Sequence, residues 1–154
     1  MHQSSMKLMR GFRNRYLGCH LSGCTILDVG SAQLPGHRSY RELFDGYDYT
    51  GMDVEAGENV DVVGYESLGT YDVVISGQVM EHIARPWEWL KHLEGLYRHY
   101  ICIIAPNRWG EHRYPIDCYR FLPDGMLALF NYAGIVPLEI RAVGKDTIGI
   151  GGKG

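Results

Sequence analysis

Short hydrophobic segments recur along the chain, with polar or glycine-containing segments between them. Several of these segments are apolar at almost every position, which is typical of strands that are buried on both faces. The C-terminal part contains two further β-type segments, close enough to pair as a hairpin. We expect strands at Thr25–Gly30, Tyr49–Asp53, Val60–Val63, Tyr71–Ser76 and Tyr100–Ala105, and a hairpin of Val136–Val143 with Thr147–Ile150.

Helix signals lie between the strands. Proline at positions 86 and 123 stands where the first turn of a helix favours it, and Gly134 is suited to a helix C-cap. The N-terminal segment has apolar residues at helical spacing among arginines, so it fits either a helix that covers a sheet edge or, less well, a helix on a membrane surface. We expect helices at Ser5–Leu17, His37–Phe44, Pro86–Arg98 and Pro123–Ala133.

The alternation of strands and helices predicts an α/β fold with a mainly parallel sheet, flanking helices and a C-terminal antiparallel hairpin. Only Val54–Asn59 separate the second and third strands. A parallel crossover normally needs about a dozen residues, so we expect shortened crossovers without helices after the second and third strands. The 154 residues are consistent with one domain, 1–154, in which an N-terminal helix (1–20) precedes a core (25–154).

Composition and charge exclude several classes. The net charge of −3 gives no basic surface for nucleic acid, and no apolar run approaches the length of a membrane span. The N-terminus lacks the apolar core of a signal peptide, so we expect a cytoplasmic protein with reduced cysteines. Cys19, His20 and Cys24 could supply part of a zinc site, but no second pair completes it, and no metal is expected.

Polar residues at the strand ends are the candidate ligand-binding groups, because ligands of such sheets bind at the carboxyl ends of the strands. Gly30 lets the backbone approach a ligand closely, and a helix after it would offer free N–H groups. Asp53 could accept hydrogen bonds from the two hydroxyls of a ribose. Each residue also has a structural alternative: a turn glycine, a loop acid and, for Glu81 and His82, a simple ion pair.

Two motifs then point to one family. Residues Tyr71–His82 contain the form DVVxxxxxxEH, and Glu111–Pro123 contain H-x-x-P-x-D-x-Y-R-F-x-P. In these motifs and in the order of its strand ends, the chain resembles the class I S-adenosylmethionine-dependent methyltransferases, of the bacterial methyltransferase type 11-like group. The resemblance covers about Thr25 to the C-terminus and implies a Rossmann-like fold with S-adenosylmethionine as cofactor.

The resemblance also implies roles for individual residues. Glu81 and His82 would fix the loop after the fourth strand. The cofactor would contact three groups of residues: Asp28, Gly30 and Ser31 along its methionine part; Asp53 at the ribose and Val54 at the adenine; and Ser76, Gly77 and Gln78 near the sulfonium.

The expected function is methyl transfer to a small-molecule, sugar or lipid-linked acceptor, with a hydroxyl as the expected target. His112 is the candidate general base, since imidazole titrates near neutrality, and Asp117 could orient it or bind the acceptor. Alternatively, Asp117 pairs with Arg120 and anchors the loop. A nicotinamide-dependent enzyme is disfavoured because G-x-G-x-x-G is absent after the first strand. A catalytically silent cofactor-binding module or partner subunit remains the second hypothesis.

The missing crossover helix also bears on assembly. Apolar residues at 60, 62 and 63 would be only partly covered within one chain, so we expect a homodimer that buries this flank. In the alternative, the N-terminal helix folds over the flank and the protein is a monomer.

Overall fold

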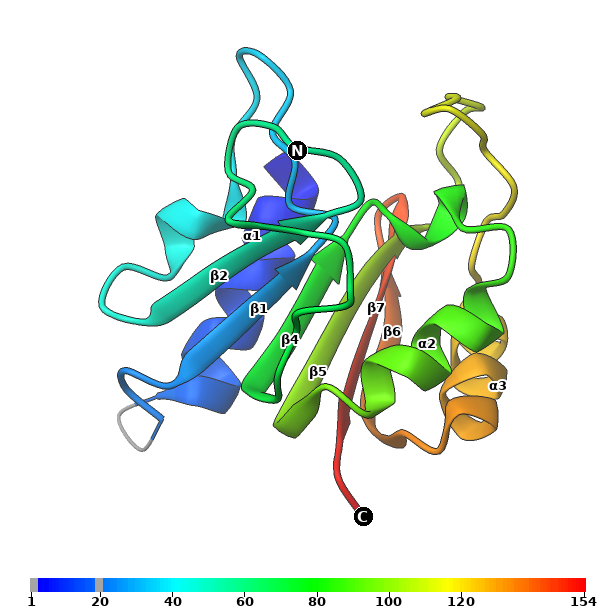
Figure 1. Cartoon of the computed structure of the whole chain (residues 1–154). Coiled ribbons are helices and arrows are strands. Elements are labelled where there is room, and N and C mark those ends of the chain that lie inside the picture. The colour runs from blue at the N-terminus through cyan, green and yellow to red at the C-terminus, as the bar shows by residue number, and fades with distance from the viewer. Residues whose placement is uncertain (1–2, 19–20) are drawn as a thin grey trace.

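A seven-stranded sheet forms the centre of the protein in the computed structural model, which describes residues 3–18 and 21–154 (Figure 1). The strand order is β3-β2-β1-β4-β5-β7-β6, and all neighbours are parallel except β7, which is antiparallel to β5 and β6. This arrangement confirms the predicted fold class. The strands are β1 (Thr25–Val29), β2 (Asp48–Asp53), β3 (Val62–Val63), β4 (Tyr71–Gly77), β5 (Tyr97–Pro106), β6 (Val136–Val143) and β7 (Asp146–Gly152).

The strand order reverses between β1 and β4. From β1 the chain proceeds to β2 and β3 on one side, and from β4 it proceeds to β5 on the other. In sheets of this kind, ligands bind at the carboxyl ends of the strands at the point where the order reverses. Asp28 of β1 lies opposite Gly51 of β2 and Ile75 of β4.

Helices cover both faces of the sheet (Figure 1). On one face, α2 (Pro86–Glu94) and α3 (Pro123–Ala133) pack together over the core, and Gly134 ends α3 in the predicted left-handed C-cap conformation. The helix α2 stops at Glu94 rather than at the predicted Arg98, because Gly95 caps it and β5 begins at Tyr97.

The opposite face is covered by α1 (Gln3–Phe12), which continues as a π-helical turn to Leu17. Met6, Met9 and Phe12 are buried there against β5 and β7. The prediction that this helix covers a sheet edge is therefore wrong, because its apolar stripe packs against strands inside the sheet. The partial zinc site at Cys19 and His20 lies outside the described residues. Within the described part of the chain, no helix is long and apolar enough to cross a membrane.

The flank at β2 and β3 has no long helix. In place of the helix predicted at 37–44, a short 3₁₀ turn, η2 (Tyr40–Leu43), begins with a capping box formed by Ser39 and Glu42. The links from β2 to β3 and from β3 to β4 contain no helix, as predicted from their lengths. Instead Tyr65, in the second link, packs on the core and accepts a hydrogen bond from Trp89 Nε1 at 2.8 Å.

Candidate functional site

The loop after β1 turns sharply at Gly30. This glycine has a φ of 80°, and its missing Cβ leaves the space that the Val79 side chain fills. The backbone N–H groups of Gly30 and Ser31 both donate to the Met52 carbonyl, at 2.8 and 3.0 Å. No long helix follows, so the expected row of free helical N–H groups is absent from residues 31–39, where the backbone forms an irregular loop.

This loop is joined to the β2–β3 link by a reciprocal pair of hydrogen bonds. Ser31 Oγ donates to the Asn59 carbonyl, and Asn59 Nδ2 donates to the Ser31 carbonyl, both at 2.9 Å. Gly51 lies directly beneath, where a Cβ would collide with the Asn59 carbonyl. The link is also held by Arg41, whose Nε donates to Asn59 Oδ1 at 2.5 Å and whose guanidinium pairs with Asp61. We call Ser31, Asn59 and Gly51 the loop junction.

Asp53 ends β2 beside this loop. One of its carboxylate oxygens accepts the N–H of Ala32 at 3.0 Å, and the other accepts the N–H of Val54 at 2.7 Å. These bonds fix the carboxylate next to the Gly30 turn. The Val54 side chain is 68% exposed, so it is available for contact with a ligand.

Asp28 is buried on the other side of the turn. Its carboxylate accepts a hydrogen bond from the Tyr49 hydroxyl. Burial raises the pKa of Asp28 to about 7, although Tyr49 and the charge of Arg41 oppose the shift. Asp28 is thus a buried acid that changes charge near neutral pH.

The end of β4 holds the next three predicted residues. Ser76 Oγ donates to the Val29 carbonyl at 2.6 Å and so ties β4 to β1. Gly77 has no side chain, and the buried Tyr40 hydroxyl occupies the space beside it. Gln78 has a left-handed φ of 61°, and its Nε2 donates to Asp146 at 3.0 Å. Gln78 Oε1 is buried and has no hydrogen-bond partner among the described residues.

Two polar residues at this edge were not found from the sequence. Asp146, at the start of β7, is fully buried and accepts hydrogen bonds from Ser4, Gln78 and Trp109. Tyr40 pairs with the Ser5 hydroxyl of α1. Both residues join α1 to the carboxyl ends of the strands. No motif marks them, since an acid that starts a C-terminal strand and a tyrosine in a loop are common in any sequence.

The segment after β5 holds His112 and Asp117. The Asp117 carboxylate accepts hydrogen bonds from both terminal nitrogens of Arg120, at 2.6 and 2.7 Å. It also accepts one from the backbone N–H of His112, at 2.6 Å. The hydrogen bonds from Arg120 hold the pKa of Asp117 well below its usual range. This geometry matches the loop-anchoring alternative for Asp117. The catalytic roles of both residues stay predictions.

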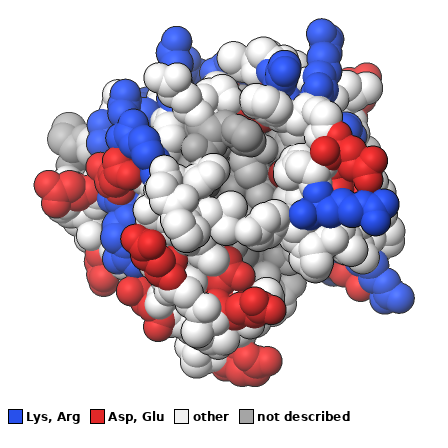
Figure 2. All heavy atoms as spheres, turned by 90° about the horizontal axis from the view of Figure 1, so that it is seen from above, with Lys and Arg blue, Asp and Glu red and all other residues white. Residues whose placement is uncertain are grey.

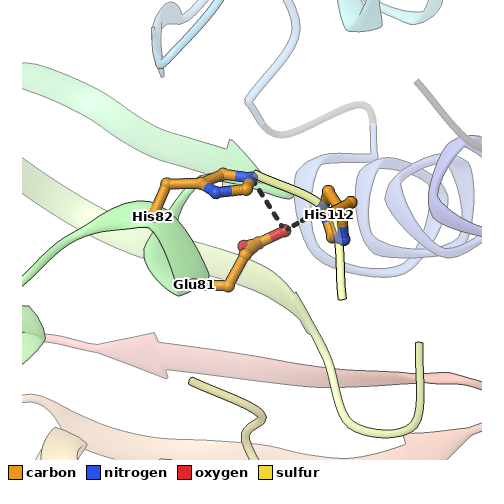
Figure 3. Close-up of side chains that lie close together, drawn as sticks. All are labelled: Glu81, His82 and His112. Carbon is orange, nitrogen blue, oxygen red and sulfur yellow. Dashed lines mark ion pairs between the residues drawn. The ribbon is translucent and has the colours of Figure 1, made fainter. Parts of the chain in front are cut away.

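His112 also faces Glu81 and His82 (Figure 3). Glu81 Oε1 lies 3.6 Å from His82 Nε2 and 3.7 Å from His112 Nε2, and the two imidazole rings meet edge to face at 5.0 Å. The Glu81 side chain is fully buried, and burial raises its pKa to about 7. A buried carboxylate therefore lies between two histidines that come from different segments of the chain.

Figure 2 shows the same edge from above, with charged side chains of both signs around its rim. A hollow of about 680 Å³ lies beside β2 and is lined by Gln33, Arg41, Tyr49 and Asn59. A second hollow, of about 470 Å³, lies between α1 and Arg38. None of the predicted cofactor residues lines either hollow, and beside Gly77 the Tyr40 hydroxyl fills the space.

Comparison with solved structures identifies the fold. A 1,6-didemethyltoxoflavin-N1-methyltransferase from Burkholderia thailandensis, with bound S-adenosylhomocysteine, is similar over 98% of this chain and 79% of its own, at a TM-score of 0.76 and 15% identity. Magnesium protoporphyrin IX methyltransferase from Synechocystis PCC 6803 is similar over 99% of this chain and 84% of its own, at a TM-score of 0.70 and 13% identity. An S-adenosylmethionine-dependent methyltransferase from Aquifex aeolicus is similar over 99% of this chain and 98% of its own, at a TM-score of 0.62 and 17% identity.

The sequence itself matches no protein-family model and no curated protein. The chain has the fold of the class I S-adenosylmethionine-dependent methyltransferases, as the motifs predicted. At identities of 13 to 17% the similarity is one of fold, and function has to be argued from the site.

Proposed function

We propose that this chain is an S-adenosylmethionine-dependent methyltransferase that acts on a small-molecule, sugar or lipid-linked acceptor. The observation that carries the proposal is the reversal of strand order between β1 and β4, because ligands of such sheets bind at this point and the predicted cofactor residues lie at the ends of these strands and of β2. Structures of the same fold contain S-adenosylhomocysteine. We propose that residues 1–154 act as one cofactor-binding unit.

The residues present fit this cofactor. Asp53 offers the ribose a fixed carboxylate, and Val54 offers the adenine an exposed apolar surface. Gln78 Oε1, which has no partner among the described residues, is an acceptor for the ammonium group of the methionine part. Asp28, Gly30 and Ser31 would border that part, and Ser76 and Gly77 would lie near the sulfonium.

The cofactor would supply a methyl group that its sulfonium already activates. The protein's task is then to hold the acceptor in line with the methyl group and to exclude water, which can account for much of the rate enhancement. The segment around His112 contacts Glu81 and His82, which follow β4, and would form the acceptor side. If the acceptor is a hydroxyl, an imidazole at this position can take its proton. The similar proteins named above act on different compounds, so the fold leaves the acceptor open.

A cofactor-binding module without catalysis is the second candidate. It is favoured by the irregular loop after Gly30 and by Tyr40, which narrows the space beside Gly77. Both candidates bind S-adenosylhomocysteine, and only the enzyme transfers a methyl group. Transfer of labelled methyl groups to a panel of hydroxylated acceptors separates them.

Asp53→Ala is expected to weaken S-adenosylhomocysteine binding by about 1.5–3 kcal/mol, or roughly 10- to 150-fold, because hydrogen bonds to a charged group contribute this much. Calorimetry on the purified protein measures the affinity. Glu55→Ala, which removes an exposed acid two residues away, is the matched control and should leave it unchanged. Equal affinities of the wild type and Asp53→Ala, or binding of NAD in place of S-adenosylhomocysteine, would contradict the proposed site.

We also propose that two copies pair along the β2–β3 flank. The edge strand β3 has only two residues, and Val63 is 53% exposed. The monomer alternative is wrong in placing the N-terminal helix here, since α1 packs mainly on β5, β7 and η2. Sedimentation at micromolar concentration should give about twice the chain mass of 17.4 kDa. Val63→Lys should then shift the protein to a monomer, whereas a wild type that stays near one chain mass at all concentrations would exclude the dimer.

The cytoplasm stays the predicted compartment. Cys24, Cys102 and Cys118 are free thiols in the structure, which is compatible with a reducing environment.

A further inference from the structure

The carboxylate of Glu81 has no partner suited to its burial. The residue lies in the 3₁₀ turn η3 (Met80–His82), its side chain is 0% exposed, and neither oxygen accepts a hydrogen bond from any described residue. The guanidinium of Arg120, whose charge acts on Glu81, donates hydrogen bonds to both oxygens of Asp117. An ionised carboxylate in such surroundings requires a cation or a hydrogen-bond donor.

The two neighbouring imidazoles turn the same atom toward this carboxylate. His82 and His112 each place Nε2 within 3.7 Å of Glu81 Oε1, and the three ligand atoms lie within 4.8 Å of one another (Figure 3). A cation with bonds of about 2.0–2.1 Å holds tetrahedral ligands roughly 3.4 Å apart. Small rotations of the exposed His112 side chain would bring the three atoms to that spacing.

The other nitrogen of each imidazole already has an acceptor. His82 Nδ1 lies 2.5 Å from the Ile116 carbonyl, and His112 Nδ1 lies 3.2 Å from the Gly110 carbonyl. A backbone carbonyl can only accept, so these contacts place the proton on Nδ1 and the free lone pair on Nε2. Metal-binding histidines are oriented in this way, with the remote N–H donated to a carbonyl or carboxylate.

We propose that Glu81, His82 and His112 bind a divalent transition-metal cation, with Zn²⁺ the best match to two imidazoles and one carboxylate. The proposal departs from the expectation of no metal, which rested on the segment of Cys19, His20 and Cys24. The site is accessible, because the His112 side chain is 38% exposed and the His82 side chain 14% exposed. Three protein ligands leave a fourth position open, as in catalytic rather than structural zinc sites.

The inference can be tested apart from methyl transfer, because binding can be measured without cofactor or acceptor. With a metal bound, His112 Nε2 would be a ligand and would not take the acceptor's proton. The wild type and the variants are first treated with a chelator and then titrated with Zn²⁺. The wild type should bind one equivalent of Zn²⁺ more than Glu81→Gln or His112→Ala does. Zn²⁺ should also raise the melting temperature of the wild type. Co²⁺ in the same site should give the visible absorption of a low-coordinate complex. His99→Ala is the matched control, since His99 lies on β5 before the buried part of that strand and only approaches Asp72, at 3.9 Å.

Loss of the extra equivalent in Glu81→Gln and His112→Ala, but not in His99→Ala, supports the site. The His112→Ala result does not depend on the burial of Glu81, so a folding defect in Glu81→Gln leaves the test valid. Equal stoichiometry and affinity in the wild type and in His112→Ala would overturn the proposal. A Zn²⁺-binding protein that fails to bind S-adenosylhomocysteine would retain this inference while the proposed function fails.

Discussion

Asp28→Asn is expected to stabilise the protein above pH 7 by up to about 4 kcal/mol and to have little effect near pH 4. The pKa of Asp28 rises from 3.8 to about 7 in the folded protein because burial disfavours its charge. Each pKa unit corresponds to about 1.4 kcal/mol. The folded state therefore binds the proton more tightly, so the wild type loses stability as the pH rises from about 4 to 7 and loses no more above 7.

Asparagine keeps the shape of the side chain and can still accept the Tyr49 hydroxyl hydrogen, but it carries no charge. Urea unfolding of the wild type and of Asp28→Asn at several pH values gives the difference between their free energies of unfolding. The contributions of other titrating groups largely cancel in this difference. The groups that act on Asp28 are Tyr49, Arg41 and Asp53. Asp48→Asn, on the exposed start of β2, is the control and should show no such difference. A difference that does not change with pH would contradict the assigned pKa.

The same variant bears on function. If Asp28 borders the methionine part of the cofactor, Asp28→Asn should bind S-adenosylhomocysteine more weakly while being more stable. A residue that lowers stability at its site of action is typical of functional sites.

Gly51→Ala is expected to destabilise the protein by about 1–3 kcal/mol or more, the usual range for overpacking. The new methyl group would overlap the Asn59 carbonyl and lie 2.7 Å from Ser31 Oγ. Because the first obstacle is backbone, a side-chain rotation cannot relieve it. The methyl group would also break the two hydrogen bonds between Ser31 and Asn59 in the loop junction. We therefore expect the affinity for the cofactor to fall together with the stability.

Gly57→Ala is the matched control. It lies in the same β2–β3 link, and a Cβ there would meet only ordinary contacts at 3.9 Å. Thermal unfolding and calorimetry with S-adenosylhomocysteine measure the two effects on both variants. Equal melting temperatures for Gly51→Ala and Gly57→Ala would show that the loop junction is not close-packed.

The sheet was predictable from the sequence because its central strands β1, β4 and β5 are buried on both faces. Such strands carry an apolar pattern that needs no knowledge of their neighbours, as at Tyr71–Gly77. The shortened crossovers followed from chain length alone. The segment before Phe44 was predicted as a helix, but the capping box at Ser39 begins only a single 3₁₀ turn.

The candidate residues at the strand ends could be predicted because motifs mark them. Contacts between distant segments of the chain could not be predicted. Asp146 and Ser4 are 142 positions apart, and no pattern links an acid in a hairpin to a serine in an N-terminal helix. The sequence also placed Glu81 and His82 side by side and His112 in a later loop. Only the fold shows that all three converge.

The position of β7 has a consequence for the order in which the protein can be assembled. This last strand lies between β5 and β6, so neither of those strands has its final neighbour until residues 146–152 have been synthesised. Until then the edge of β5 that pairs with β7 has open backbone N–H and carbonyl groups. Open edges of this kind can pair with other chains. The nascent chain is therefore most exposed to aggregation just before its synthesis reaches the C-terminal hairpin.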